Sequence, residues 1–393
     1  MRIEKVTEHV SWMGVLDPNL EIFDIVIPTE WGSTYNAYII KGEKIALVET
    51  AKEVFDDEYI AKLKDVVDPS KIDYLIVNHT EPDHAGSVSR VLELNPEITI
   101  VSSKSAELFL KEQLNRPFKS LVVTDGDTLS LGNLNLEFIS APFLHWPDSM
   151  FTYLKEEQVL FTCDAFGCHY CHPEGKIFDD EVGDFAEAYR YYYDEIMAPF
   201  KPYIVEAVDK VIDLPIKIIA TGHGPILRTE PKKYMSLYKE WSLPVKKEGK
   251  KLVVAYVSAY GNTKKLAEAI AAGFKKAGGD VDVLDVAQMD FREMRAAFEK
   301  ADALAFGSPT FNADAVLPIW IAIGAVSPKT SRNKPALAFG DYGWSGEGVS
   351  LMEERMKGLK LKLVETGFKV RFTPTEADLA RANELGAKLY QEG

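Results

Sequence analysis

The chain has 393 residues, of which 46% are hydrophobic and 27% charged, and its formal net charge is −15. This length allows two domains, each with its own core, and the acidic balance argues against non-specific nucleic-acid binding, which needs a basic face. The first residues hold no apolar signal-peptide core, and the longest apolar run is too short to span a bilayer, so we expect no membrane segment. The three cysteines cannot all pair, so we expect a reducing cytoplasm.

The first half of the chain predicts a mixed α/β architecture. Alternating apolar and polar residues predict strands at 25–30, 36–42, 44–50 and 135–140, and residues 180–208 are mostly helical. These short, mixed elements indicate stacked layers of strands and helices, but they leave the strand order open.

A polar loop follows the buried strand predicted at 74–78. It presents four side chains able to bind a metal, namely His79, Glu81, Asp83 and His84. Residues just beyond the C-terminal end of a strand are where α/β folds display ligands, and these groups are costly to bury without a partner. The loop taken alone is equally compatible with a metal site and with a solvated polar loop.

Three further candidates also follow apolar, strand-like runs. His145 comes after the run at 135–140, Asp164 follows the run LFTC, and His223 stands between two glycines after the run IIAT. An isolated histidine is more often a core or surface residue than a ligand. The repeated position at the end of a strand nevertheless favours a joint metal site with the loop residues.

The stretch CDAFGCHYCH, residues 163–172, contains the C-x-x-C-H pattern that attaches a c-type haem. Haem attachment normally requires an exported chain, and so short a pattern recurs by chance, so we expect no haem here. Packing is the preferred interpretation for Cys168, Cys171 and the histidine that follows each, with a redox or metal-sensitive role left open. Cys163, beside Asp164, is expected to point away along its strand.

A charged, glycine-containing stretch at 245–251 predicts a linker, and we place the domain boundary between residues 249 and 250. Beyond it, apolar runs alternate with helical patterns. Strands are predicted at 251–257, 281–286, 303–308, 335–340 and 368–372. Strand–helix alternation at this spacing predicts a parallel sheet with helices on both faces.

The stretch SAYGNT, residues 258–263, follows the first of these strands and looks like the phosphate loop of flavodoxins. The hydroxyl groups of Ser258 and Thr263, with the N–H groups of a helix N-terminus, can hold a phosphate, and Gly261 permits close approach of a ligand. The same pattern also caps ordinary helices.

Two more loops of the second half, after its third and fourth strands, would flank a flavin ring at the switch point of such a sheet. Their aromatic residues could stack on the ring or simply pack within the loops. The predicted contacts with FMN are Ser258, Tyr260, Gly261, Asn262, Thr263, Ser308, Pro309, Thr310, Phe311, Asn312, Asp341, Tyr342, Gly343, Trp344 and Gly346.

The pattern H-x-E-x-D-H at 79–84, followed by a distant His, an Asp and G-H-G, resembles the metal framework of the metallo-β-lactamase fold. The usual hydrolases of that fold have His where this chain has Glu81, and they bind zinc; a carboxylate ligand suits iron better. A domain of this kind followed by a flavodoxin-like domain is the layout of flavodiiron proteins, and the resemblance covers essentially the whole chain. It implies an αββα sandwich over residues 1–249 and a doubly wound parallel sheet over residues 250–393.

The resemblance also implies the ligands of two irons. One iron would be held by His79, Glu81 and His145, the other by Asp83, His84 and His223, with Asp164 as the bridge between them. Members of the family differ in whether the residue corresponding to His84 binds the metal. Asp148 and the tyrosines of residues 189–195 are candidate partners of the ligating histidines.

The activity implied is reduction of O2 to water, of NO to N2O, or of both, with electrons relayed through FMN. The cysteines do not form the two C-x-x-C pairs of an attached rubredoxin, so the expected donor is external, either a rubredoxin-type protein or reduced deazaflavin F420. Family members form head-to-tail dimers, so a homodimer or a dimer of dimers is expected.

Two other functions remain open from the sequence. One is a zinc-dependent hydrolase with a flavodoxin attached, which Glu81 disfavours because the usual zinc enzymes have a histidine there. The other is an electron carrier with a non-catalytic, degraded metal domain, which the complete set of seven ligand candidates disfavours.

Overall fold

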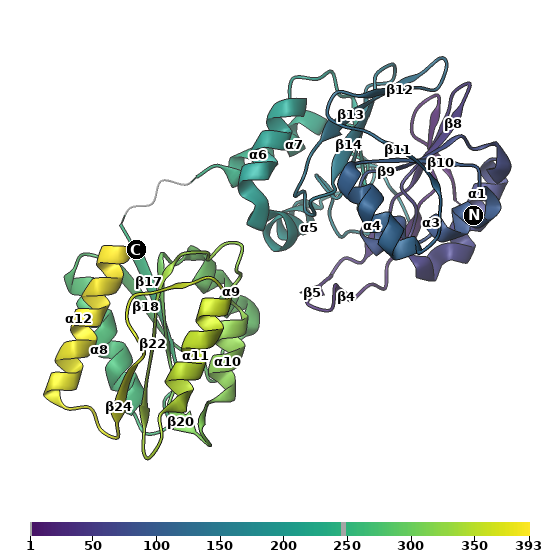
Figure 1. Ribbon diagram of the computed structural model, residues 1–393. Helices are drawn as coiled ribbons and strands as arrows, with labels where there is room; N and C mark the ends of the chain where they lie inside the picture. The colour runs from purple at the N-terminus through teal and green to yellow at the C-terminus, as the bar shows by residue number, and fades with distance from the viewer. Residues whose placement is uncertain (1, 245–248) are drawn as a thin grey trace. The chain divides into compact units, whose positions relative to one another are not determined.

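The computed structural model describes residues 2–244 and 249–393, which form two compact units that divide after residue 244 (Figure 1). Residues 245–248 of the predicted linker lie outside the described residues. Within the described ranges, every helix is too short or too polar to cross a membrane.

The N-terminal unit is built on two sheets, with strand orders β1-β2-β7-β8-β9-β10-β11 and β12-β13-β14-β15-β16. The strands of the first sheet are β1 (Glu4–Lys5), β2 (Val10–Trp12), β7 (Tyr38–Lys41), β8 (Ile45–Val48), β9 (Tyr74–Val77), β10 (Thr99–Ser102) and β11 (Lys119–Val122). Those of the second sheet are β12 (Thr128–Ser130), β13 (Asn135–Ser140), β14 (Met150–Leu154), β15 (Val159–Cys163) and β16 (Ile218–Thr221). Two short pairs, β3 (Val15–Asp17) with β6 (Ser33–Tyr35) and β4 (Ile22–Phe23) with β5 (Ile27–Pro28), lie outside both sheets.

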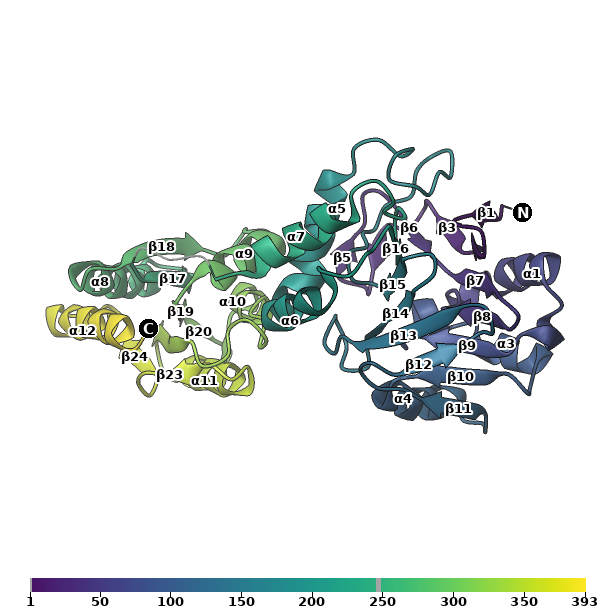
Figure 2. The same cartoon turned by 90° about the horizontal axis from the view of Figure 1, so that it is seen from above.

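Helices cover the outer faces of these sheets, which gives the expected αββα sandwich (Figures 1 and 2). The α-helices are α1 (Asp56–Val66), α2 (Pro82–Ala85), α3 (Val88–Leu94), α4 (Lys104–Leu114), α5 (Ala186–Tyr192), α6 (Lys201–Val211) and α7 (Pro231–Ser242). Shorter helical turns are η1 (Glu53–Phe55), η2 (Pro69–Lys71), η3 (Tyr193–Met197) and η4 (Ala198–Phe200). Helices α1, α3 and α4 pack on the first sheet, and α5, α6 and α7 on the second.

Alternation along the strands assigns each side chain to a layer. In β15, Leu160 packs toward α5–α7, whereas its neighbour Phe161 enters the core between the two sheets. Where β8, β9, β10 and β11 run parallel, their C-terminal ends reach one edge of the sandwich. That edge is where the candidate metal ligands emerge.

Two predicted elements of this unit differ from the structure. The strand predicted at 25–30 is reduced to Ile27–Pro28, because the chain turns through left-handed backbone at Asp24 and Ile25. The helical region predicted at 180–208 begins only at Ala186, and a π-helical turn, η3, interrupts it. Neither deviation has a periodic signal in the sequence.

The C-terminal unit is a parallel sheet of order β18-β17-β19-β22-β23, with β24 also paired to β22. Its strands are β17 (Lys251–Tyr256), β18 (Asp280–Asp285), β19 (Ala303–Gly307), β22 (Pro335–Tyr342), β23 (Lys362–Leu363) and β24 (Phe368–Arg371), and a hairpin of β20 (Thr310–Phe311) and β21 (Asp314–Ala315) stands apart. Its helices are α8 (Asn262–Lys276), α9 (Phe291–Lys300), α10 (Leu317–Gly324), α11 (Glu347–Gly358) and α12 (Glu376–Glu392). The predicted doubly wound sheet is confirmed.

Both faces of this sheet are covered, as Figure 1 shows. Helices α8 and α12 pack on one face and α9, α10 and α11 on the other. The backbones of α8 and α12 approach so closely that a Cβ at Gly273 would collide with the carbonyl oxygen of Asn383, and one at Gly386 with that of Ile270. Glycine at these two positions therefore sets the distance between the two helices.

Candidate metal centre

The loop after β9 turns its polar side chains inward. His79, Glu81, Asp83 and His84 are all buried. The backbone there is fixed by Thr50, whose N–H and hydroxyl both donate to the carbonyl oxygen of His84 at 2.8 and 2.7 Å. The solvated-loop interpretation is therefore wrong, and these groups need partners inside the fold.

One set of ligand atoms gathers around Glu81. Its Oε2 atom lies 2.9 Å from Nε2 of His145 and 3.2 Å from Nε2 of His79. Oδ2 of Asp164 is 3.4 Å from each of these two nitrogens. The four residues each present one ligand atom within 4.8 Å of the others, which is the spacing of groups around a single metal ion.

A second set gathers around Asp83. Its carboxylate oxygens lie 3.2 Å from Nε2 of His223 and 3.6 Å from Nε2 of His84. The other oxygen of Asp164, Oδ1, is 2.9 Å from Nε2 of His84 and 3.2 Å from that of His223. Asp164 thus directs one oxygen into each set, which is the arrangement of a bridging carboxylate.

Several polar atoms in this centre have no hydrogen bond. Among the described residues, both oxygens of Asp83, Oδ2 of Asp164 and Nε2 of His223 are buried and unsatisfied. Each unsatisfied group costs about 1–3 kcal/mol, and more when it is charged. Most of the short N···O distances in the two sets lack hydrogen-bond geometry, so these atoms point at common positions and not at one another. The donor set therefore fits two divalent cations.

Charge pairing sets the pKa values of these groups. Burial disfavours the charged form of Asp164, yet His84 and the other surrounding imidazoles hold the pKa of this carboxyl well below its usual value. Burial likewise opposes protonation of the histidines, but the adjacent carboxylates raise the pKa of His145 to about 9 and that of His223 to about 10. Metal binding must therefore displace protons from imidazoles.

Outer partners orient the ligating rings. Nδ1 of His79 lies 3.2 Å from Oδ2 of Asp148, which also accepts hydrogen bonds from the N–H and hydroxyl of Thr80 at 2.8 Å each. Nδ1 of His223 lies 2.6 Å from the carbonyl oxygen of Thr34. In both rings Nδ1 therefore carries a proton and donates it in a hydrogen bond to the partner. The other nitrogen, Nε2, faces the centre.

The tyrosines of residues 189–195 were candidate partners of the ligating histidines, and one of them, Tyr192, reaches the centre. His169 and Ser33 were not identified as site residues from the sequence. The hydroxyl of Tyr192 donates to Oδ1 of Asp164 at 3.0 Å. His169 is buried beside the ring of His223, with a centroid distance of 4.9 Å, and its Nδ1 contacts the hydroxyl of Ser33 at 3.0 Å. The only sequence signals were the tyrosine run at 189–193 and the unexplained histidine.

The expectation that Cys163 points away from the site is wrong. Its sulfur lies within 4.8 Å of ligand atoms of His84 and Asp164. The register of β15 shifts between Phe161 and Cys163, and the backbone at Cys163 is left-handed, so the regular alternation of a strand does not hold there. Burial raises the pKa of this thiol well above its usual value, so it remains protonated. In the described part of the chain, Cys168 and Cys171 are buried free thiols that join no group of candidate metal ligands.

The predicted phosphate loop joins β17 to α8. Gly261 has a φ of +84°, and a Cβ there would meet no atom within 4 Å, so the backbone leaves open space for a ligand. Ser258 Oγ accepts a hydrogen bond from the N–H of Lys264 at 3.3 Å. The hydroxyl of Thr263 donates to the carboxylate of Asp341, which ties this loop to the end of β22.

The other predicted flavin contacts lie at the same end of the sheet. Tyr260 and Trp344 are 87% and 85% exposed, and Phe311 is exposed as well. Ser308 is buried, with its hydroxyl accepting from the N–H of Val316. Asn262 begins α8, Pro309 precedes β20, and Thr310 begins it. Asn312 lies in the turn between β20 and β21, Tyr342 ends β22, and Gly343 and Gly346 follow β22. Open space at Gly261 beside exposed aromatic rings fits a planar phosphorylated cofactor.

Known proteins resemble this chain over its whole length. The family described as ODP family beta lactamase matches residues 33–224, and Flavodoxin matches residues 254–386. The Flavo-diiron protein FprA2 of Clostridium acetobutylicum is 42% identical over 391 residues, with 97% of each chain covered. The Nitric oxide reductase of Moorella thermoacetica is 39% identical over 395 residues, which cover 98% of this chain and 97% of the relative. The solved structure of rubredoxin oxygen:oxidoreductase from Desulfovibrio gigas aligns with a TM-score of 0.74 at 28% identity, over 99% of this chain and 98% of that one.

Proposed function

The chain belongs to the flavodiiron protein family, and from this premise we propose that it reduces O2 to water, NO to N2O, or both at a di-iron centre, with electrons relayed through FMN from an external donor. The protein is an oxidoreductase whose cofactors are FMN and two non-haem irons. Support for the two substrates comes from relatives named for nitric oxide reduction and for oxygen reduction.

The observation that carries the proposal is the division of Asp164 between two ligand sets. In this assignment one iron would be held by His79, Glu81 and His145, the other by Asp83, His84 and His223, and Asp164 would bridge them. When bound, two ferrous ions and a reduced FMN would together supply the four electrons that conversion of O2 to two waters requires, and the irons would polarise the substrate.

The residues of this chain prepare the centre for that chemistry. Three carboxylates, those of Glu81, Asp83 and Asp164, neutralise much of the charge of two divalent ions in a buried position. Tyr192 holds a proton 3.0 Å from the bridging carboxylate, because burial raises the pKa of its phenol well above the usual value. Such a phenol can donate a hydrogen bond to an anionic oxygen at the centre.

In the second unit, we assign the FMN phosphate to the loop 258–263 and the flavin ring to the loops after β19 and β22. The start of α8 contributes backbone N–H groups, and exposed Tyr260, Phe311 and Trp344 offer flat apolar surfaces. With this assignment, residues 1–249 form the di-iron domain and residues 250–393 the FMN domain.

The proposal extends to partners and assembly. An external donor, either a rubredoxin-type protein or reduced deazaflavin F420, would reduce the FMN. A head-to-tail homodimer, or a dimer of such dimers, would bring the flavin of one subunit to the irons of the other. Free thiols at all three cysteines support a reducing compartment, and we propose the cytoplasm.

The test is anaerobic reduction of the purified protein, followed by separate measurements of O2 and NO consumption with each candidate donor. Iron and flavin analysis of the same sample should give two irons and one FMN per chain. Zinc in place of iron, together with hydrolysis of an ester or thioester, would support the hydrolase alternative. Correct iron and FMN loading without consumption of either gas would support the electron carrier.

A further inference from the structure

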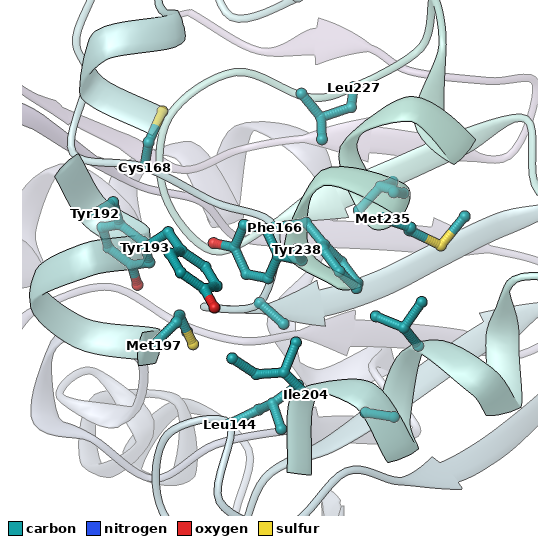
Figure 3. Close-up of a cluster of buried hydrophobic side chains, with 14 of the residues drawn as sticks. Leu144, Phe166, Cys168, Tyr192, Tyr193, Met197, Ile204, Leu227, Met235 and Tyr238 are labelled. Carbon is teal, nitrogen blue, oxygen red and sulfur yellow. The ribbon is translucent and has the colours of Figure 1, made fainter. Parts of the chain in front are cut away.

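Five tyrosines lie between the metal centre and a surface pocket of the N-terminal unit. Tyr189 and Tyr192 stand on α5, Tyr193 begins the π-helical turn η3, and Tyr234 and Tyr238 stand on α7. Figure 3 shows Tyr192 and Tyr193 on one helical segment beside Tyr238. We name these five residues the tyrosine chain.

The inner end of the tyrosine chain touches the centre directly. Tyr192 is fully buried, its hydroxyl donates to Oδ1 of Asp164 at 3.0 Å, and its ring lies 6.1 Å from that of His223 between centroids. Its neighbour Tyr193 is also fully buried. Consecutive side chains of a regular helix point about 100° apart, whereas a π-helical turn re-aims one of them, so η3 allows both tyrosines to enter the same core.

From Tyr193 outward, each ring follows the last at a similar distance. The centroid distances are 5.1 Å from Tyr193 to Tyr238, 5.3 Å from Tyr238 to Tyr189 and 5.2 Å from Tyr189 to Tyr234. Trp241 offers a second route, at 5.0 Å from Tyr193 and 5.8 Å from Tyr189. Tyr193 is in ring contact with the first residue of each route, Tyr238 or Trp241.

The outer end of the chain opens into a surface pocket of about 360 Å³ lined by Tyr189, Tyr234 and Trp241. The guanidinium of Arg190 lies 4.6 Å from the centroid of Trp241 and opposes a positive charge on that ring. Asp179, another residue of this pocket, places a negative charge near Tyr234 instead. Electrostatics therefore makes Tyr234 the more easily oxidised end.

The inner phenols are neutral and hydrogen-bonded, mostly to weak bases. Tyr193 contacts the hydroxyl of Ser242 at 2.8 Å, and Tyr238 and Tyr189 donate to backbone carbonyl oxygens at 3.4 and 3.1 Å. A phenol with such a partner loses an electron only to a strong oxidant, because its proton has no strong base to receive it. The chain would therefore not divert electrons that FMN delivers in ordinary turnover.

We propose that the tyrosine chain carries oxidising equivalents from the di-iron centre to the surface when the centre meets O2 without its full supply of electrons. This inference rests on the proposed O2 reduction. When the cofactors provide only three of the four electrons, Tyr234 supplies the fourth, which passes inward along the tyrosine chain to the centre. The phenolic proton of Tyr234 leaves to solvent. The proton needed at the centre is taken from solvent at that end. The tyrosyl radical is then reduced by a low-molecular-weight thiol, which gives up one hydrogen atom, and two thiyl radicals combine into a disulfide.

Packing alone does not require tyrosine at these positions, since phenylalanine fills nearly the same space. The test therefore uses Tyr193→Phe, which removes the phenol in contact with both Tyr238 and Trp241, and Tyr234→Phe, which removes the exit. The matched control is Tyr153→Phe, at a buried tyrosine of the same core whose hydroxyl donates to the carbonyl oxygen of Pro215 at 2.9 Å. Melting temperatures of all variants show whether the fold is retained.

The full-length protein, loaded with iron and FMN, is reduced by three electrons per chain and mixed with O2. In a separate arm it is reduced by one electron per chain and mixed with hydrogen peroxide, so that each arm leaves the centre one electron short. Electron paramagnetic resonance of frozen samples should show a tyrosyl radical, and peptide mass spectrometry should find oxidation products at Tyr234. Tyr193→Phe should lose the products at Tyr234 and gain damage at Tyr192 and the metal ligands. Tyr234→Phe should keep an internal radical, and the control should match the unsubstituted protein.

Absence of products at Tyr234 in the unsubstituted protein, or equal amounts in Tyr193→Phe, would overturn the inference. The peroxide arm keeps this result independent of the proposed function, because peroxide oxidises the irons without O2 reduction. Steady-state gas consumption by the unsubstituted protein tests the proposed function by itself. If Tyr193→Phe does not fold, the oxidation products in Tyr234→Phe test the proposal instead. Oxidation confined to the metal ligands, with none at Tyr189, would contradict transfer along the tyrosine chain.

Discussion

Replacement of Asp148 by Asn tests how the centre is oriented from outside. Asp148 is fully buried and accepts hydrogen bonds from His79 and from the N–H and hydroxyl of Thr80. Asn keeps one oxygen for Thr80 and turns its NH2 group toward Nδ1 of His79. Because NH2 is a donor, it favours the tautomer with the proton on Nε2, the atom that faces Glu81 and the metal position.

The expected loss is large enough to measure. Removal of such an outer partner weakens metal binding by about 10–100-fold, which corresponds to about 1.4–2.7 kcal/mol. The loss should be confined to the set of His79, Glu81 and His145, so a chelator should remove one of two irons first. The assay is anaerobic titration of the iron-loaded protein with a ferrous chelator, with absorbance read at each step.

A charge-matched control is Asp125→Asn, because Asp125 is an exposed carboxylate, 3.4 Å from Lys210. This control should release iron as the unsubstituted protein does. Retention of both irons by Asp148→Asn, at unchanged chelator concentrations and an unchanged melting temperature, would refute the proposed orienting role of Asp148.

Three further predictions follow from the same geometry. Glu81→His should raise the ratio of zinc to iron in protein expressed with both metals, because an imidazole replaces a hard oxygen ligand. Elemental analysis measures this ratio, and gas uptake should show lower consumption. An unchanged ratio would contradict the role of Glu81. Iron affinity should increase from pH 6 to 9, because the pKa values of His145 and His223 are raised to about 9 and 10 and both rings must lose a proton to bind metal. The increase should be up to about tenfold per pH unit for each such histidine. An affinity that does not change with pH in calorimetric titrations would disprove this prediction. Gly386→Ala should lower the stability of the FMN domain by about 1–3 kcal/mol, since its Cβ would collide with the backbone of Ile270, and an unchanged calorimetric transition would argue against this helix contact.

The sequence was most informative where chemistry coincides with strand ends. His79, Asp164 and His223 each follow an apolar run, and the runs proved to be β9, β15 and β16, so their ends meet at one edge of the sandwich. The alternation of strands and helices beyond residue 250 likewise predicted the parallel sheet, because each period there is long and regular.

What the sequence could not show depends on contacts between distant segments and on irregular backbone. Tyr192 reaches Asp164 across 28 positions, through a helix whose π-helical turn has no periodic signature. Cys163 lies beside His84 and Asp164, where a register shift and a left-handed residue disturb the usual alternation of the strand. The turn at Asp24 and Ile25, which shortens a predicted strand, also depends on left-handed backbone at non-glycine residues.

The most direct test of the account is Mössbauer spectroscopy of the full-length protein loaded with isotopically enriched iron. If Asp164 bridges two irons, the spectrum should show a spin-coupled pair in the oxidised protein, and Asp164→Ala should abolish the coupling. A single iron, two uncoupled irons, or a centre that accepts only zinc would contradict the claim that these seven side chains hold a di-iron site.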